Sequence, residues 1–137
     1  TLDEIRALPV AELAAKNCVL WLWTTNAFMR EAFTVLDAWG FKEKTILTGA
    51  KDKMGVGDWL RGATEHCIMA IRGKPLVTLT NQTTLLEGQV REHSRKPAEF
   101  YQLVEKLCHG TKLDMFTRTE RKGWSAWGAE VGKFASA

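Results

Sequence analysis

The sequence lacks long apolar runs and has few cysteines. Spanning a bilayer takes about 20 consecutive apolar residues, and no run in these 137 residues approaches that length. Cys18, Cys67 and Cys108 lie dozens of residues apart and form no Cys-x-x-Cys pair, which argues against a disulfide or zinc framework. The start at Thr1 lacks the charged-then-apolar layout of a signal peptide. We therefore expect a cytoplasmic protein with no membrane association.

Signatures of several enzyme classes are missing as well. Neither Gly-x-Gly-x-x-Gly nor a P-loop occurs, and both are standard phosphate-binding motifs. Their absence argues against a dinucleotide-dependent dehydrogenase and against a nucleotide hydrolase. No Gly-x-Ser-x-Gly occurs, so a serine hydrolase has no recognisable nucleophile elbow. His66, His93 and His109 are not spaced as a metal-binding set. We expect structural or solvent-facing roles for these histidines.

The net charge is small, but the basic residues are clustered. The formal charge is +3 and the sequence pI about 8.8, below the range typical of dedicated nucleic-acid binders. Basic residues gather in Lys42 to Lys53, Arg91 to Lys96 and Arg118 to Lys122, which fits either a solvated face or a nucleic-acid surface. With 45% hydrophobic and 26% charged residues, the chain has the composition of a single globular domain over residues 1–137.

Hydrophobic periodicity alternates between strand and helix patterns. Cys18 to Thr24 is a short, nearly continuous apolar run, which is typical of a parallel strand buried on both faces. A helix is predicted from Thr1, where Glu4 three residues later makes a capping box, and Pro9 restarts a short helix through Ala15. A second amphipathic pattern starts at a possible Asn26 cap and ends at Gly40, with Phe28, Ala32, Val35, Leu36 and Trp39 on its apolar stripe; a third runs from Pro97 to Gly110, with Phe100, Leu103, Val104 and Leu107 on its stripe. Further strands are predicted over Lys44 to Thr48, Glu65 to Ile71, Leu76 to Leu79 and Lys112 to Arg118. We expect an α/β fold with a doubly wound, mostly parallel open sheet and one hairpin, formed by Glu65 to Ile71 and Leu76 to Leu79. Ligands of such sheets bind at the carboxyl ends of the strands.

Six tryptophans stand beside a single tyrosine. Trp21, Trp23 and Trp39 lie in apolar periodic segments and are predicted core residues. The remaining three lie in glycine-rich or charged surroundings typical of loops, and they are candidates for stacking on a planar ligand: Trp59, Trp124 and Trp127.

Two polar segments are candidates for ligand binding. The glycine-rich stretch Gly49 to Gly62 is either a flexible turn region or a loop from which Asp58, Arg61 and Glu65 bind a base. Arg91 to Pro97 directly precedes a predicted helix, so it is either a charged loop or a docking place for a carboxylate or phosphate.

Several separate blocks together resemble one family. The blocks are Leu20-Trp-Leu-Trp-Thr-Thr-Asn26, Ala38-Trp-Gly-Phe41, Gly55-x-Gly-x-Trp-x-Arg-Gly62, Glu65-His66, Arg91-Glu-His-Ser-Arg-Lys-Pro-Ala-Glu-Phe-Tyr101, Leu113-Asp-Met-Phe-Thr-Arg118 and Gly123-Trp-Ser-Ala-Trp-Gly-Ala-Glu-Val131. In this order, and over essentially the whole chain, they resemble the MT-A70-type adenine-N(6) methyltransferases.

The resemblance implies binding of S-adenosylmethionine on a Rossmann-like sheet and transfer of its methyl group to the exocyclic amine of adenine in DNA or RNA. By the same resemblance, the cofactor-binding residues would be Lys96, Asp114, Arg118 and Glu130. The substrate-binding residues would be Trp59, Arg61, Glu65, Ser94 and Lys96. Carboxylates accept bonds from ribose hydroxyls, and Lys and Arg match the donor's carboxylate. Nucleic acid and a second subunit, identical or related, are the implied partners.

The sequence departs from the family at its catalytic signature. Asp-Pro-Pro-Trp does not occur in these 137 residues; in the family it precedes the region where this chain starts and carries a central strand between those of Cys18 to Thr24 and Leu113 to Arg118. Asp58, Gly49-Ala50 and Ala129 also replace residues usual in relatives, so we expect weaker base and donor binding. We assign no catalytic residue and expect this chain alone to be inactive.

Three interpretations remain open. The chain is the major part of an active adenine methyltransferase whose catalytic segment lies upstream, or it is a truncated relative acting as a non-catalytic subunit or nucleic-acid-binding module. A gene fragment without a present function is the third.

Overall fold

The computed structural model describes residues 2–50, 59–60, 62–78, 81–86, 98–115 and 124–127. By its internal contacts the chain divides into two compact units, described separately below. The first unit comprises Thr1–Leu76 with Asn81–Glu87, and the second comprises Val77–Thr80 with Gly88–Ala137.

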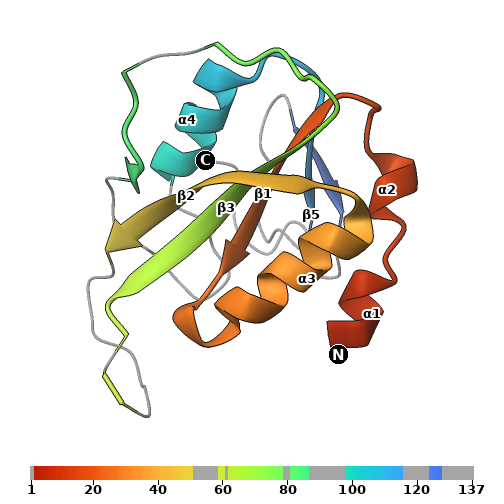
Figure 1. Ribbon diagram of the computed structural model, residues 1–137. Coiled ribbons are helices and arrows are strands. Elements are labelled where there is room, and N and C mark those ends of the chain that lie inside the picture. The colour runs from red at the N-terminus through yellow and green to blue at the C-terminus, as the bar shows by residue number, and fades with distance from the viewer. Residues whose placement is uncertain are drawn as a thin grey trace. The chain divides into compact units, whose positions relative to one another are not determined.

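A four-stranded sheet with the order β1-β3-β2-β4 forms the first unit (Figure 1). Its strands are β1 (Cys18–Thr24), β2 (Lys42–Ala50), β3 (Thr64–Arg72) and the short β4 (Leu85–Leu86). β3 is antiparallel to both β1 and β2, whereas β4 is parallel to β2. β1 and β2 therefore run in the same direction with β3 between them.

The mixed α/β class is confirmed, but the predicted pairing of three strands is wrong. Cys18–Thr24 was expected to pair in parallel, and it pairs antiparallel with β3. The hairpin of Glu65 to Ile71 with Leu76 to Leu79 does not form, because β1 and β2 occupy both edges of β3. The antiparallel neighbours in sequence are instead β2 and β3. An apolar run predicts a strand but not its partner, since pairing depends on residues distant in the sequence.

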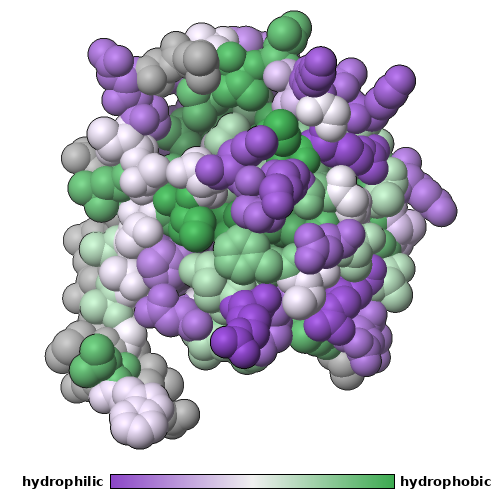
Figure 2. Space-filling model, viewed as in Figure 1, coloured by the Kyte–Doolittle hydropathy of each residue, from purple (hydrophilic) through white to green (hydrophobic). Residues whose placement is uncertain are grey.

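Helix α3 (Met29–Trp39) packs on this sheet through one apolar stripe, and Figure 1 shows it lying across the sheet. Ala32, Val35, Leu36 and Trp39 are buried at helical spacing, as predicted. The helix begins at Met29, later than expected, because Asn26–Phe28 forms a 3-10 turn, η1, and the capping position of α3 is Phe28 in place of Asn26. Hydrophilic residues gather on the outward side of this layer in Figure 2.

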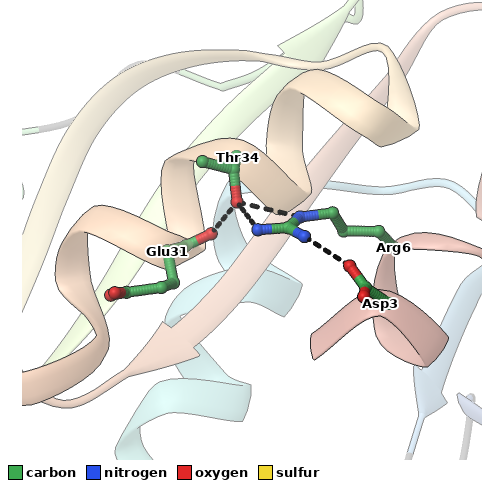
Figure 3. Close-up of polar contacts among 4 residues, drawn as sticks. All are labelled: Asp3, Arg6, Glu31 and Thr34. Atoms are coloured by element: carbon green, nitrogen blue, oxygen red, sulfur yellow. Dashed lines mark hydrogen bonds and ion pairs between the residues drawn. The ribbon is translucent and has the colours of Figure 1, made fainter. Parts of the chain in front are cut away.

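Two short helices precede β1. α1 (Leu2–Arg6) is bound to α3 by Arg6, whose Nε and Nη2 lie 3.1 and 2.9 Å from the Thr34 hydroxyl oxygen (Figure 3). Arg6 also forms an ion pair with Asp3 at 2.8 Å, and the Trp39 indole donates to the Ile5 carbonyl at 3.2 Å. α2 (Val10–Leu13) follows Pro9 as predicted, but it ends before Ala15.

The second unit contains α4 (Ala98–Leu107) and a two-stranded parallel sheet of β5 (Lys112–Met115) and β6 (Trp124–Trp127). The buried residues of α4 are Phe100, Tyr101, Leu103 and Val104, close to the predicted stripe. The remainder of the predicted strand Lys112 to Arg118 lies outside the described residues.

The tryptophans are placed partly as expected. Trp39 is buried, whereas Trp21 and Trp23 are half-buried. Trp124 is not a loop residue, because it lies in β6, stacks edge-on against Tyr101 and donates from its indole to Glu105 at 3.1 Å. These contacts make Trp124 a packing residue and remove it from the stacking candidates. Trp127 also lies in β6, not in a loop.

Candidate nucleotide site

The structure describes three of the residues that the sequence assigned to a site. Trp59 and Glu65 belong to the first unit, and Asp114 lies in β5 of the second. The other five lie outside the described residues: Arg61, Ser94, Lys96, Arg118 and Glu130.

Glu65 lies beside the carboxyl ends of β1 and β2, where the sequence predicted ligand binding. β1 ends at Thr24 and β2 ends at Ala50, and the antiparallel β3 begins at this same edge with Thr64. Glu65 is half-buried, and its partner across the ladder is Gly49 of β2. A carboxylate here can accept hydrogen bonds from an amine, which is the chemistry that adenine offers.

Trp59 is almost fully exposed. Its side chain is 96% exposed and that of the next residue, Leu60, is 87% exposed. An indole displayed to solvent offers a flat face to a base, and stacking on an aromatic ring is worth roughly 1–3 kcal/mol per base. The predicted exposure of Trp59 is confirmed, whereas its stacking role stays a prediction.

A row of polar side chains on the face of the sheet opposite to Glu65 was not recognised as a group from the sequence. The row crosses three strands, because Thr24 of β1 and Thr48 of β2 are both ladder partners of His66. The Thr48 hydroxyl lies 3.0 Å from His66 Nδ1, and the Thr64 hydroxyl lies 3.3 Å from Nε2. The structural role expected for His66 fits these bonds. The spacing Thr64-x-His66 places these two side chains on one face of a strand and could be read from the sequence. The proximity of Thr48 to His66 follows only from the register between β2 and β3.

The 3-10 turn η1 adds an exposed aromatic side chain after the carboxyl end of β1. Phe28 is 65% exposed, and Thr25 and Asn26 are also exposed. Sequence periodicity placed Phe28 on the apolar face of a helix, and that placement is wrong. The helix starts only at Met29, so Phe28 does not share the stripe of α3.

Asp114 is the third of the four residues of β5, and it is paired with Ala126 of the parallel β6. The carboxyl ends of two parallel strands lie at one edge, where α/β sheets bind nucleotides. The backbone of this second unit therefore presents an acidic residue near such an edge.

Two absences apply to the described part of the chain. No group of three or more His, Cys, Asp or Glu side chains is placed to hold a metal ion among these residues. No helix there has the length and apolar character that crossing a membrane requires.

Comparison with known proteins identifies the family. The family model MT-A70 matches residues 1–130, almost the whole chain. The protein belongs to the MT-A70 family. This match confirms the resemblance carried by the sequence blocks.

Named relatives of this MT-A70 chain include plant, bacterial and animal proteins. A probable N(6)-adenosine-methyltransferase MT-A70-like protein of Oryza sativa is 32% identical over 140 residues, covering 94% of the chain and 20% of the relative. The type II methyltransferase M.MunI of a Mycoplasma species is 30% identical, covering 95% and 58%. The human N(6)-adenosine-methyltransferase catalytic subunit METTL3 is 29% identical, covering 85% and 22%. The chain thus spans about a fifth of the length of the eukaryotic relatives.

Proposed function

We propose that this MT-A70 domain binds S-adenosylmethionine and an adenine-containing nucleic acid, for methylation of the exocyclic amine of adenine. The observation that carries the proposal is the family match over residues 1–130, whose relatives are named as adenosine methyltransferases. The position of Glu65 at the carboxyl ends of β1 and β2 supports it.

The four residues assigned to the cofactor have side-chain chemistry that matches the groups of S-adenosylmethionine. Asp114 near the carboxyl end of β5 supplies a carboxylate of the kind that accepts ribose hydroxyls, and Glu130 supplies a second. Lys96 and Arg118 supply the charges that pair with the donor's carboxylate. When bound, the donor provides an electrophilic methyl group; the residues of this chain bind and orient it.

Adenine binding is assigned chiefly to Glu65 and Trp59. We assign Glu65 to accept a hydrogen bond from the adenine amine and Trp59 to stack on the base, while Arg61, Ser94 and Lys96 face the nucleotide. Since Asp-Pro-Pro-Trp does not occur in residues 1–137, we propose that these residues alone bind both ligands without transferring the methyl group. The proposed assembly is a dimer of identical or related subunits.

The doubly wound Rossmann-like sheet is also proposed. β1 and β2 run in the same direction and are connected through helix α3, and β5 is parallel to β6. Both features support such a sheet, in which β3 is an antiparallel strand between two parallel ones.

Calorimetry with S-adenosylmethionine and S-adenosylhomocysteine tests donor binding. We expect saturable heat, and at a hundredfold excess over Kd a stabilisation of about 2.7 kcal/mol. Asp114→Asn should weaken binding at least tenfold, whereas Asp37→Asn, an exposed acid on α3, should not. No heat from a folded protein would contradict the cofactor assignment.

A further inference from the structure

Both ring nitrogens of His66 are bonded to threonine hydroxyls that come from two different strands. Thr48 Oγ1 of β2 is 3.0 Å from Nδ1, and Thr64 Oγ1 of β3 is 3.3 Å from Nε2. Because Thr48 is the ladder partner of His66 and Thr64 lies two residues before it, the three side chains share one face of the sheet. A neutral imidazole has one donor and one acceptor nitrogen, and a hydroxyl serves as either, so both bonds form in either tautomer.

These bonds lie where β2 and β3 leave the sheet. β2 ends at Ala50, two residues after Thr48, and β3 begins at Thr64. The connection between them, residues 51–63, includes Trp59 and Arg61, two of the proposed substrate contacts. The bridge therefore ties together the two strand ends that carry this connection.

Glu65 lies between the two bridged residues of β3. Successive side chains of a strand point to opposite faces, so Glu65 projects from the face opposite to Thr64 and His66. Its ladder partner is Gly49, which has no side chain to pack beside it. Fixing both neighbours of Glu65 restricts its backbone, and so the direction in which its side chain leaves the strand.

We propose that Thr48, His66 and Thr64 form a positioning bridge that aims Glu65 at the adenine amine. The proposal rests on the function proposed above, in which Glu65 contacts adenine. The bridging residues touch neither base nor donor; they act through Glu65.

The test uses a paired variant and a matched control. Thr48→Val with Thr64→Val removes both hydroxyls and keeps the branched shape of each side chain. Thr24→Val is the control, because Thr24 is also a ladder partner of His66, but its hydroxyl bonds to the Thr25 carbonyl at 3.3 Å. Every protein in the comparison contains all 137 residues.

The first readout is base selectivity. It is the ratio of affinities for a single-stranded oligonucleotide with one adenine and for the same strand with purine, which lacks the amine, measured in DNA and in RNA. The paired variant should lower this ratio about fivefold, the size of one lost hydrogen bond, and Thr24→Val should leave it unchanged. In a Glu65→Ala background, which has no side-chain acceptor at this position, the paired variant should lower it no further, because the bridge acts through Glu65.

The second readout is amide hydrogen exchange at residues 64–66 without ligand. Exchange should accelerate in the paired variant and not in Thr24→Val. An unchanged ratio, or an equal fall in the control, overturns the positioning role. A wild-type protein that does not distinguish the two strands contradicts the proposed function itself; the bridge is then judged by exchange, and unchanged exchange overturns it.

Discussion

At the scale of single residues, Arg72 of β3 binds the end of helix α2. Its guanidinium donates to the carbonyls of Ala11, Ala14 and Ala15 at 2.8, 2.6 and 2.7 Å, and it lies 5.5 Å from the centre of the Phe41 ring. The last carbonyls of a helix lack intrahelical partners, so one arginine satisfies the end of α2 from strand β3.

Arg72→Met keeps most of the side-chain length and removes these donors. We expect the free energy of unfolding to fall by about 2–3 kcal/mol, because hydrogen bonds to charged groups are among the stronger ones. Urea denaturation measures the loss. Lys74→Met, a change to an exposed lysine nearby, should cost less than about 0.5 kcal/mol. Equal losses would show that Arg72 does not hold α2.

The Cys18 thiol lies next to the same arginine. Partial burial raises its pKa above the ordinary value, and the positive charge of Arg72 offsets part of this rise. The thiolate is the reactive form, so near neutral pH Cys18 should react with iodoacetamide more slowly than a small-peptide thiol. The folded state holds this proton more tightly than the unfolded chain, so stability should decline as the pH rises through the raised value. Mass spectrometry of the alkylated peptide at several pH values measures the rate of the iodoacetamide reaction. A rate equal to or faster than that of a small-peptide thiol would contradict the raised pKa.

At the scale of elements, helix α3 depends on the way it ends. Gly40 has φ +82°, its N–H donates to the Asp37 carbonyl, and the Phe41 N–H donates to the Leu36 carbonyl at 3.0 Å. This is the left-handed glycine cap that the sequence predicted at Gly40.

Gly40→Ala should destabilise the protein by about 1 kcal/mol, although no atom lies within 4 Å of the added Cβ. The cost comes from the backbone alone, because a residue with a Cβ is strained at this φ. Gly110→Ala is the matched control, since its Cβ also meets open space and its φ is not positive. Thermal unfolding compares the two, and equal melting temperatures would contradict the reason given.

At the scale of the whole molecule, electrostatic attraction should govern nucleic-acid binding. The net charge of +3 is modest, so the attraction depends on clusters such as Lys42 to Lys53. Each phosphate contact to a single strand releases counterions, which lowers affinity as salt rises.

Affinity for a single-stranded oligonucleotide should therefore fall steadily with salt concentration. Lys44→Gln, which removes an exposed charge of β2, should reduce the logarithmic salt slope by about 0.7 if Lys44 contacts a phosphate. Lys106→Gln on α4 lies outside the basic clusters and should leave the slope unchanged. An affinity that does not depend on salt would contradict the nucleic-acid partner.

Sequence by itself determined the family, the α/β class and most elements of this MT-A70 chain. Apolar periodicity is local, so it located α3, α4, β1, β2, β3 and β5 within a few residues, and the sequence also identified the Gly40 cap and the exposure of Trp59. It missed the short β4 and β6. The motif blocks led to Glu65 before any pairing was known.

Only the tertiary structure decided which strands meet. β3 comes after β1 and β2 in the chain yet lies between them, and this order could not be read from apolar runs that look alike. The same register brings Thr48 to His66, and it converts Trp124 from an expected loop residue into a partner of Tyr101 and Glu105. Strand pairing and side-chain packing join residues distant in sequence, so local patterns carry no record of them.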